Sequence, residues 1–143
     1  MYIRQLSIFL ENVPGSLIRP TQLLADAGID LIAMSIADAA EYGILRCIVA
    51  KPDKAAAILR EAGYIVRQTN VLGVCVPDCP GGLCEILKVL AAAGISVEYL
   101  YSFVRRREGV ALLIFHLSDI QKGAEILRTN GVELLDESQL GEM

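Results

Sequence analysis

The sequence has no apolar run long enough to cross a membrane. A spanning helix needs about 20 apolar residues, whereas the longest runs here, such as Val110 to Phe115, have the length of a strand. The chain also lacks the basic start and apolar segment of a signal peptide, because a strand pattern begins at Ile3. Hydrophobic residues nevertheless make up 54% of the chain, and the mean hydropathy is +0.48. We therefore expect a cytoplasmic protein, without membrane contact, that buries apolar surface in strands and between subunits.

A basic excess is absent as well. The net charge is −4 and the pI is about 5.0, whereas proteins that bind nucleic acid usually present a basic face. The one basic cluster, Arg105 to Arg107, falls between two strand-like runs and is interpreted as a solvated hairpin tip. We expect no nucleic-acid partner.

The residues that usually perform catalysis or bind metals are sparse. The only histidine is His116. The three neighbouring cysteines Cys75, Cys79 and Cys84 are spaced by four and five residues, which does not match a zinc ribbon or finger. Together with Cys47 they are interpreted as buried free thiols. No metal, cofactor or catalytic residue is predicted, and an enzyme is the least favoured reading.

The chain contains an internal repeat. Shifting it by 66 residues superimposes Gly15 on Gly81, Gly28 on Gly94 and Ile48 on Ile114. Later the offset becomes 68, and Gly63 matches Gly131. Shared glycines mark equal backbone requirements at element boundaries. Two related domains are predicted, at residues 1–70 and 71–143, without a flexible linker between them.

Hydrophobic periodicity gives each half the same order of elements. The first half predicts strands at 3–11, 29–37, 44–50 and 64–68 and a turn at Tyr42-Gly43. It also predicts a helix with Ser16 as its N-cap that ends at Gly28, and a second helix that starts near Pro52 and ends at Gly63. The second half predicts a strand around Leu72 to Val76, strands at 96–104, 110–117 and 132–135, helices over 83–93 and 119–129, and a frayed tail after Asp136. The fold class is α+β, with two tandem ferredoxin-like βαββαβ units.

One sheet face of each unit should lie open, because both helices of such a unit cover the other face. The side chains on this uncovered face are nevertheless apolar. Ile44 and Ile48 in the first half, and Leu112 and Ile114 in the second, point opposite to the core residues. Because exposed apolar patches mark interfaces, we expect another sheet to cover these open faces in a homodimer.

The motif Asn12-Val13-Pro14-Gly15-Ser16-Leu17, at the junction of the first strand and helix, recurs as Asp78-Cys79-Pro80-Gly81-Gly82-Leu83. In its βαββαβ context this motif resembles the ACT domain family, which regulates amino-acid enzymes. The resemblance covers about residues 2–70 and 71–137, and the tandem resembles the free-standing two-ACT proteins of bacteria. It implies two units packed side by side, with a free amino acid bound at the seam between them.

The resemblance also implies which residues line the seam. These are the two loops together with the start of the second strand of each unit: Asp30, Leu31, Ile32, Ser96, Val97 and Glu98. Loop 12–17 would face 96–99, and loop 78–83 would face 30–33. Glycines allow close approach of a ligand, free N–H groups at a helix start favour a carboxylate, and Asp30 or Asp78 can accept an ammonium group. This combination suits an amino-acid zwitterion.

Other readings remain open at this stage. Pro-Gly after a strand is also simply a good turn, and Gly82 and Ser96 in the second half replace Ser16 and Asp30, so one site could have lost its ligand. The alternative function is a non-catalytic scaffolding or interaction module with a vestigial ligand site. Its partner would be another protein, such as a metabolic enzyme.

Overall fold

The computed structural model describes residues 2–38 and 42–142, and the chain divides into two compact units. One, here called the N-terminal unit, comprises Arg4–Thr69. The other, the C-terminal unit, comprises Met1–Ile3 and Asn70–Met143. The boundary falls inside a strand rather than in a linker. Among the described residues, no helix has the length and apolar character needed to span a membrane.

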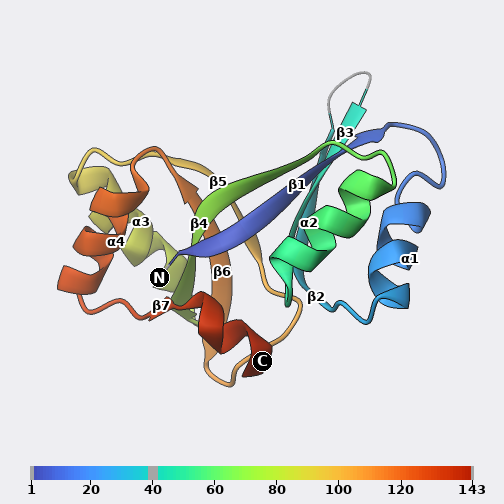
Figure 1. Cartoon of the computed structure of the whole chain (residues 1–143). Coiled ribbons are helices and arrows are strands. Elements are labelled where there is room, and N and C mark those ends of the chain that lie inside the picture. Colours follow the sequence, from blue (N-terminus) through green and yellow to red (C-terminus); the bar gives the residue numbers. More distant parts are fainter. Residues whose placement is uncertain (1, 39–41, 143) are drawn as a thin grey trace. The chain divides into compact units, whose positions relative to one another are not determined.

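The N-terminal unit is a βαββαβ fold. Its elements are β1 (Ile3–Glu11), α1 (Ile18–Asp26), β2 (Leu31–Asp38), β3 (Tyr42–Val49), α2 (Pro52–Glu61) and the first part of β4 (Val66–Pro77). The strand order is β2-β3-β1-β4, and both β2 and β1 run antiparallel to β3. Helices α1 and α2 lie on one face of this sheet (Figure 1). The core between them is built from buried side chains that include Leu6, Ile8, Leu24, Leu45, Ala55 and Leu59.

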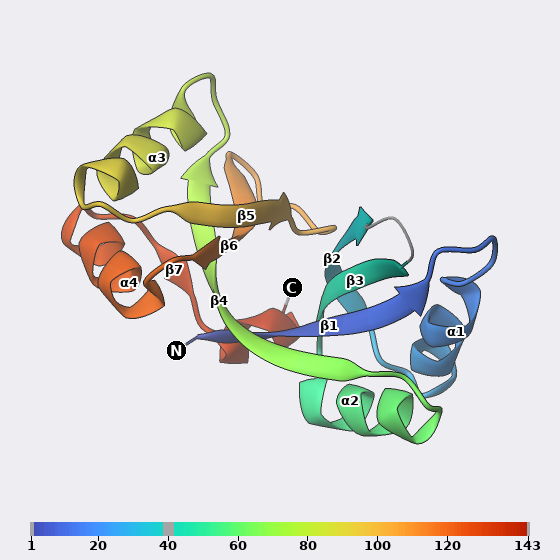
Figure 2. The same ribbon diagram turned by 90° about the horizontal axis from the view of Figure 1, so that it is seen from above.

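The C-terminal unit repeats this order. After the remainder of β4 come α3 (Gly82–Ala92), β5 (Val97–Ser102), β6 (Val110–Leu117), α4 (Ile120–Thr129), β7 (Leu134–Leu135) and the 3-10 helix η1 (Glu137–Glu142). Strand β4 pairs with β6 on one side and with β7 on the other, and β5 forms the outer strand beyond β6. Helices α3 and α4 lie together on one face (Figure 2). Their core includes Leu72, Val74, Ile86, Leu90, Phe115 and Leu127.

The predicted fold class of two tandem ferredoxin-like units is confirmed, and so are most helix ends. Each of the helices α1 to α4 is followed by a glycine with positive φ, at Gly28, Gly63, Gly94 and Gly131. The left-handed backbone at these positions closes the helix at little cost only when the residue has no side chain. Because both units need a glycine at these helix ends, the glycines recur in the sequence at offsets of 66 and 68 residues.

Four local predictions are wrong. Ser16 is not the N-cap of α1, because the helix begins at Ile18 and its cap position, Leu17, makes no side-chain hydrogen bond. Tyr42 and Gly43 belong to β3 rather than to a turn, and residues 39–41 lie outside the described residues. The two predicted strands on either side of residue 70 are one continuous strand, β4. The tail forms η1, whose Leu140 is buried.

Three of the four apolar residues that were predicted to lie on the open sheet faces are buried in the single chain. The side chains of Ile48 and Ile114 are 0% exposed and that of Leu112 is 5% exposed. Most of the apolar surface on which the predicted homodimer was based is therefore already buried, whereas Ile44 is partly exposed. The homodimer itself stays a prediction.

Both units carry a β-bulge at the same repeat position. The ladder between β2 and β3 shifts register between Leu31 and Ala33, and the ladder between β5 and β6 shifts between Val97 and Tyr99. The extra residues are Ile32 and Glu98, which are 66 positions apart. Bulges redirect side chains and are frequent beside binding sites. Both bulges fall in segments that the sequence predicted to contact a ligand.

Candidate functional site

The two loops predicted to bind a ligand adopt related but unequal conformations. In each, a glycine with positive φ turns the chain into the helix: Gly15 has φ of 82° and Gly81 has φ of 86°. In loop 12–17, the N–H of Ser16 donates to the carbonyl of Val13 over 3.2 Å. In loop 78–83, the N–H groups of Asp78 and Cys79 donate to the carbonyls of Gly109 and Pro77. The second loop is thereby tied to its own sheet.

The first loop retains more free donors. Within the part of the chain that the structure describes, the N–H groups of Val13 and Gly15 make no hydrogen bond. The side chains of Asn12 and Val13 are exposed. Unpaired backbone N–H groups at the start of a helix are suited to a carboxylate or another anion. Loop 12–17 is therefore the better anion receptor of the two.

The strand starts predicted to contact the ligand, residues 30–32 and 96–98, lie far from the loop of the same unit. Leu31 pairs with Val49, whereas the loop follows Glu11, which pairs with Tyr42. Positions 42 and 49 are seven residues apart on β3, which corresponds to about 23 Å along a strand. In the C-terminal unit, Val97 pairs with Leu117 and Pro77 with Val110. The structure therefore does not bring each loop and strand start together within one unit.

Each loop borders a hollow inside its own unit. The α1 hollow has a volume of about 510 Å³ and lies between the end of β1, loop 13–16, Arg19 and the turn after α2 at 62–65. The α3 hollow has a volume of about 740 Å³ and lies between the end of β4, loop 79–82, α3 and the turn after α4 at 130–133. A third hollow of about 420 Å³ lies on the other side of loop 12–17, toward Ile36 and Gly43. Ligand pockets commonly have volumes of roughly 300–1,000 Å³.

The profile of the ACT domain pair matches residues 1–143. The chain belongs to the ACT domain pair family. ACT domains are regulatory modules, so membership indicates regulation by small molecules but names no ligand. No protein with a curated description matches the sequence.

Solved structures agree with this assignment. The ACT pair is 40% identical to protein BT0572 from Bacteroides thetaiotaomicron, with a TM-score of 0.93 and coverage of 100% of this chain and 98% of that one. The regulatory subunit of aspartate kinase from Thermus thermophilus, in its ligand-free form, is 16% identical with a TM-score of 0.62, and the match covers 88% of this chain and 91% of that chain. The corresponding subunit from Thermus flavus is 12% identical with the same TM-score, at 90% and 92% coverage. At these low identities the two subunits share the fold alone.

The remaining predicted residues of the ACT pair lie at the strand starts. Asp30 is exposed, and its carbonyl accepts a hydrogen bond from the N–H of Ala50. Ser96 occupies the equivalent position, where its N–H donates to Ser118 Oγ over 2.9 Å and its carbonyl accepts from Ser118 N–H. Both strand starts are therefore anchored to the neighbouring strand end by their backbones.

Glu98, at the second bulge, contacts the only histidine. His116 Nδ1 lies 2.9 Å from Glu98 Oε2, although the two atoms do not form an aligned hydrogen bond. The imidazole stacks on the ring of Tyr99 at 4.7 Å between centroids. The imidazole of His116 is thus positioned by side chains of the neighbouring strand.

The four free cysteines are not uniformly buried. Cys47 and Cys75 are buried, but Cys79 and Cys84 are exposed, which corrects the sequence-based prediction. Burial raises the pKa of the Cys47 thiol to about 12. Burial, and then the Glu133 carboxylate, raise the pKa of Cys75 to about 11 against the opposing charge of Arg107. In the described part of the chain, no three His, Cys, Asp or Glu side chains are grouped to hold a metal ion.

Sequence reasoning missed the residues that shape the two hollows, above all Arg19, Tyr64, Glu85, Val132 and Glu133. A signal was present, because the turns after α2 and α4 align at the 68-residue offset that matches Gly63 with Gly131. The offset identified these turns as equivalent. It did not indicate that they face the Pro-Gly loops.

Proposed function

We propose that this chain is a non-catalytic regulatory protein that senses a free amino acid at a seam between two ACT units. The observation that supports this most strongly is loop 12–17, where a positive-φ glycine precedes a helix and the N–H groups of Val13 and Gly15 make no hydrogen bond in the described part of the chain. Such a loop can receive the carboxylate of an amino acid.

The ammonium group needs an acceptor from elsewhere. Residues 30–32 and 96–98 remain the proposed second half of each site, contributed across the seam by another ACT unit. This division follows from distance, because within one unit the loop and the strand start are separated by about seven strand residues, or roughly 23 Å. A single amino acid is too short to touch both ends, so its site requires two units.

We further propose that the two sites are unequal. In loop 78–83 the N–H groups of Asp78 and Cys79 are already bonded to Gly109 and Pro77, which leaves fewer donors for a carboxylate. The site at Asn12 is therefore the stronger candidate for binding. A ligand there regulates by favouring one of two packings of the seam, because a ligand shifts an equilibrium only by its differential affinity.

A thermal-shift screen against the twenty amino acids tests this proposal. A ligand that binds only the folded state raises the melting temperature by mass action, with a stabilisation of about 2.7 kcal/mol at 100 times its Kd. We expect one amino acid, or a chemically related group, to shift the melting temperature, with loss of the shift in Asn12→Ala and a smaller effect of Asp78→Ala. Absence of any shift at millimolar concentration would favour the interaction module.

The interaction module has one observation in its favour. Val13, Leu17, Ile18 and Ile36 are 52%, 36%, 68% and 54% exposed, and all four line the hollow of about 420 Å³ beside loop 12–17. Clustered exposed apolar side chains mark contact surfaces. Sedimentation velocity of Ile18→Ser and of the unmodified chain tests whether this exposed apolar surface mediates self-association. The same measurement tests the predicted homodimer. An unchanged sedimentation coefficient would remove the support for a second copy.

A further inference from the structure

The α3 and α1 hollows are built from matching positions of the internal repeat. Cys75 corresponds to Phe9, Glu85 to Arg19, Val132 to Tyr64 and Glu133 to Ile65. The backbones of the two turns agree, because the N–H of Val132 donates to the carbonyl of Leu127 as that of Tyr64 donates to Leu59. Each hollow can therefore be interpreted by comparison with the other.

In the α1 hollow, the chain supplies its own aromatic ring and its own cation. The guanidinium carbon of Arg19 lies 5.7 Å from the centroid of the Tyr64 ring, which is a cation–π distance. Phe9, which also lines this hollow, lies under the guanidinium of Arg67 at 5.5 Å. Large side chains thus occupy this space, and its volume is about 510 Å³.

In the α3 hollow, the equivalent side chains are small or oppositely charged. Val132 replaces the ring, Cys75 replaces Phe9, and the carboxylate of Glu85 stands where Arg19 stands in the other unit. The volume is accordingly larger, at about 740 Å³. Gly82 also lies against the carbonyl oxygen of Pro77, so this wall has no room for a side chain.

The walls and the charges define what would fit. Apolar groups of Val76, Ile86, Val89, Val110 and Val132 surround the space, which suits a ring or a branched alkyl group. Two carboxylates, those of Glu85 and Glu133, stand at the hollow. Arg107 already pairs with Glu133 at 3.2 Å, whereas the partner of Glu85 is Lys88 at 3.1 Å, with both side chains more than 60% exposed. A pair so exposed is weak, which leaves Glu85 available to a bound cation.

We propose that the α3 hollow is a second binding site, which takes a small aromatic amine. The ring of the ligand occupies the space that Tyr64 fills in the other unit, and its ammonium group pairs with Glu85. The ligand thereby supplies the ring and the cation that the C-terminal unit lacks. The α3 hollow shares residues 79–82 with the proposed seam, but amine binding there does not depend on amino-acid sensing at loop 12–17.

The test uses 2-phenylethylamine as the probe and calorimetric titration of the whole chain as the measurement, with 3-phenylpropanoate as the probe of opposite charge. We expect the amine to bind and the carboxylate not to bind. Glu85→Gln should weaken amine binding about tenfold, the size expected for loss of one charge-assisted contact. The matched variant Arg19→Gln in the α1 hollow should leave it unchanged.

Val132→Tyr restores the ring found in the N-terminal unit and should abolish binding. Protection of Cys79 gives a measurement that does not depend on how this variant folds. In a Cys84→Ser background Cys79 is the one exposed thiol among the four cysteines, and because it lines the hollow, bound amine should slow its reaction with a disulfide reagent severalfold. No binding at millimolar amine, or binding that neither protects Cys79 nor responds to Glu85→Gln, would overturn the proposal. Asn12→Ala should affect amino-acid sensing but not amine binding, so the two proposals can fail separately.

Discussion

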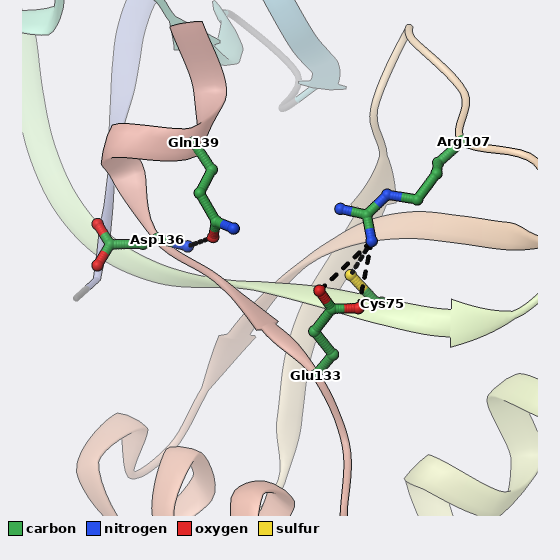
Figure 3. A network of polar contacts seen from close by, with 5 residues as sticks. All are labelled: Cys75, Arg107, Glu133, Asp136 and Gln139. Carbon is green, nitrogen blue, oxygen red and sulfur yellow. Dashed lines mark hydrogen bonds and ion pairs between the residues drawn. The ribbon is translucent and has the colours of Figure 1, made fainter. Parts of the chain in front are cut away.

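Arg107 Nη1 lies 3.2 Å from Glu133 Oε2 and 3.4 Å from Glu133 Oε1, and it also approaches Cys75 Sγ at 3.9 Å (Figure 3). The contact ties the hairpin between β5 and β6 to the turn before β7. The arginine cluster is therefore not simply a solvated tip, as the sequence suggested, because at least Arg107 has a defined partner.

The first prediction concerns the strength of this tie. Arg107→Gln should lower the free energy of unfolding by about 0.5 kcal/mol, the scale of partly exposed ion pairs, as measured by urea denaturation. The control is Arg106→Gln, at the adjacent exposed position, which has no charged partner among the described residues and should show no measurable effect. Equal losses in both variants would show that the effect reflects net charge and not the pair.

Gly82 gives the second prediction. A Cβ built at this residue would collide with the carbonyl oxygen of Pro77, a backbone atom that cannot move away as a side chain could. Gly82→Ala should therefore reduce the free energy of unfolding by roughly 1–3 kcal/mol, as overpacking does. Ser16→Gly, at the equivalent position of the other unit, should cost a few tenths of a kcal/mol at most. A Gly82→Ala protein as stable as the unmodified chain would contradict the packing described here.

The third prediction contrasts Asp119 and Ser16, two polar residues near the starts of α4 and α1. Asp119 caps α4, because its side chain accepts a hydrogen bond from the N–H of Lys122. Ser16 makes no cap bond to α1. Asp119→Ala should destabilise the protein by about 1 kcal/mol, whereas Ser16→Ala should be nearly neutral, both by thermal or urea unfolding. A larger loss from Ser16→Ala would indicate that α1 starts earlier than the structure shows.

The fourth prediction concerns alkaline pH. The folded chain keeps the Cys47 thiol protonated up to a pKa of about 12, whereas the ordinary value is 9.0. The stability contributed by this difference is complete below pH 9 and is lost as the pH rises through 12, on the order of a few kcal/mol in total. Urea unfolding should show that Cys47→Ala is less stable than the unmodified chain near neutral pH, and that this gap narrows above pH 9. A gap that stays constant would mean that Cys47 does not titrate on unfolding.

Much of the fold follows from the sequence because its signals are local. Gly63 and Gly131 mark helix ends because glycine adopts the positive φ needed there at little cost. The alternation Leu6-Ile8-Leu10 is typical of a strand with one buried face. The continuity of β4 could not be predicted in this way. A chain of strand formers gives no local mark where one domain ends and the next begins, and only the hydrogen bonds of its neighbours show that Val66–Pro77 is a single element.

The site was predictable to a different extent. The Pro-Gly loops are visible in the sequence, and they do border hollows. The sequence could not show which backbone N–H groups of the loops are free, because the hydrogen bonds from the N–H groups of Asp78 and Cys79 depend on where the carbonyls of Gly109 and Pro77 lie. Alignment of the two halves shows that Glu85 and Val132 replace Arg19 and Tyr64. Only the structure shows that each pair lines a single hollow, which is what gives the replacement its consequence.

The central claim is that the ACT pair binds a free amino acid through loop 12–17. Calorimetric titration of the unmodified chain and of Asn12→Ala, with the amino acid that gives the largest thermal shift, tests it most directly. The account predicts saturable binding by the unmodified chain and a loss of affinity of at least tenfold in Asn12→Ala, with the variant still folded. Equal affinity in both proteins, or no heat of binding with any of the twenty amino acids, would contradict it.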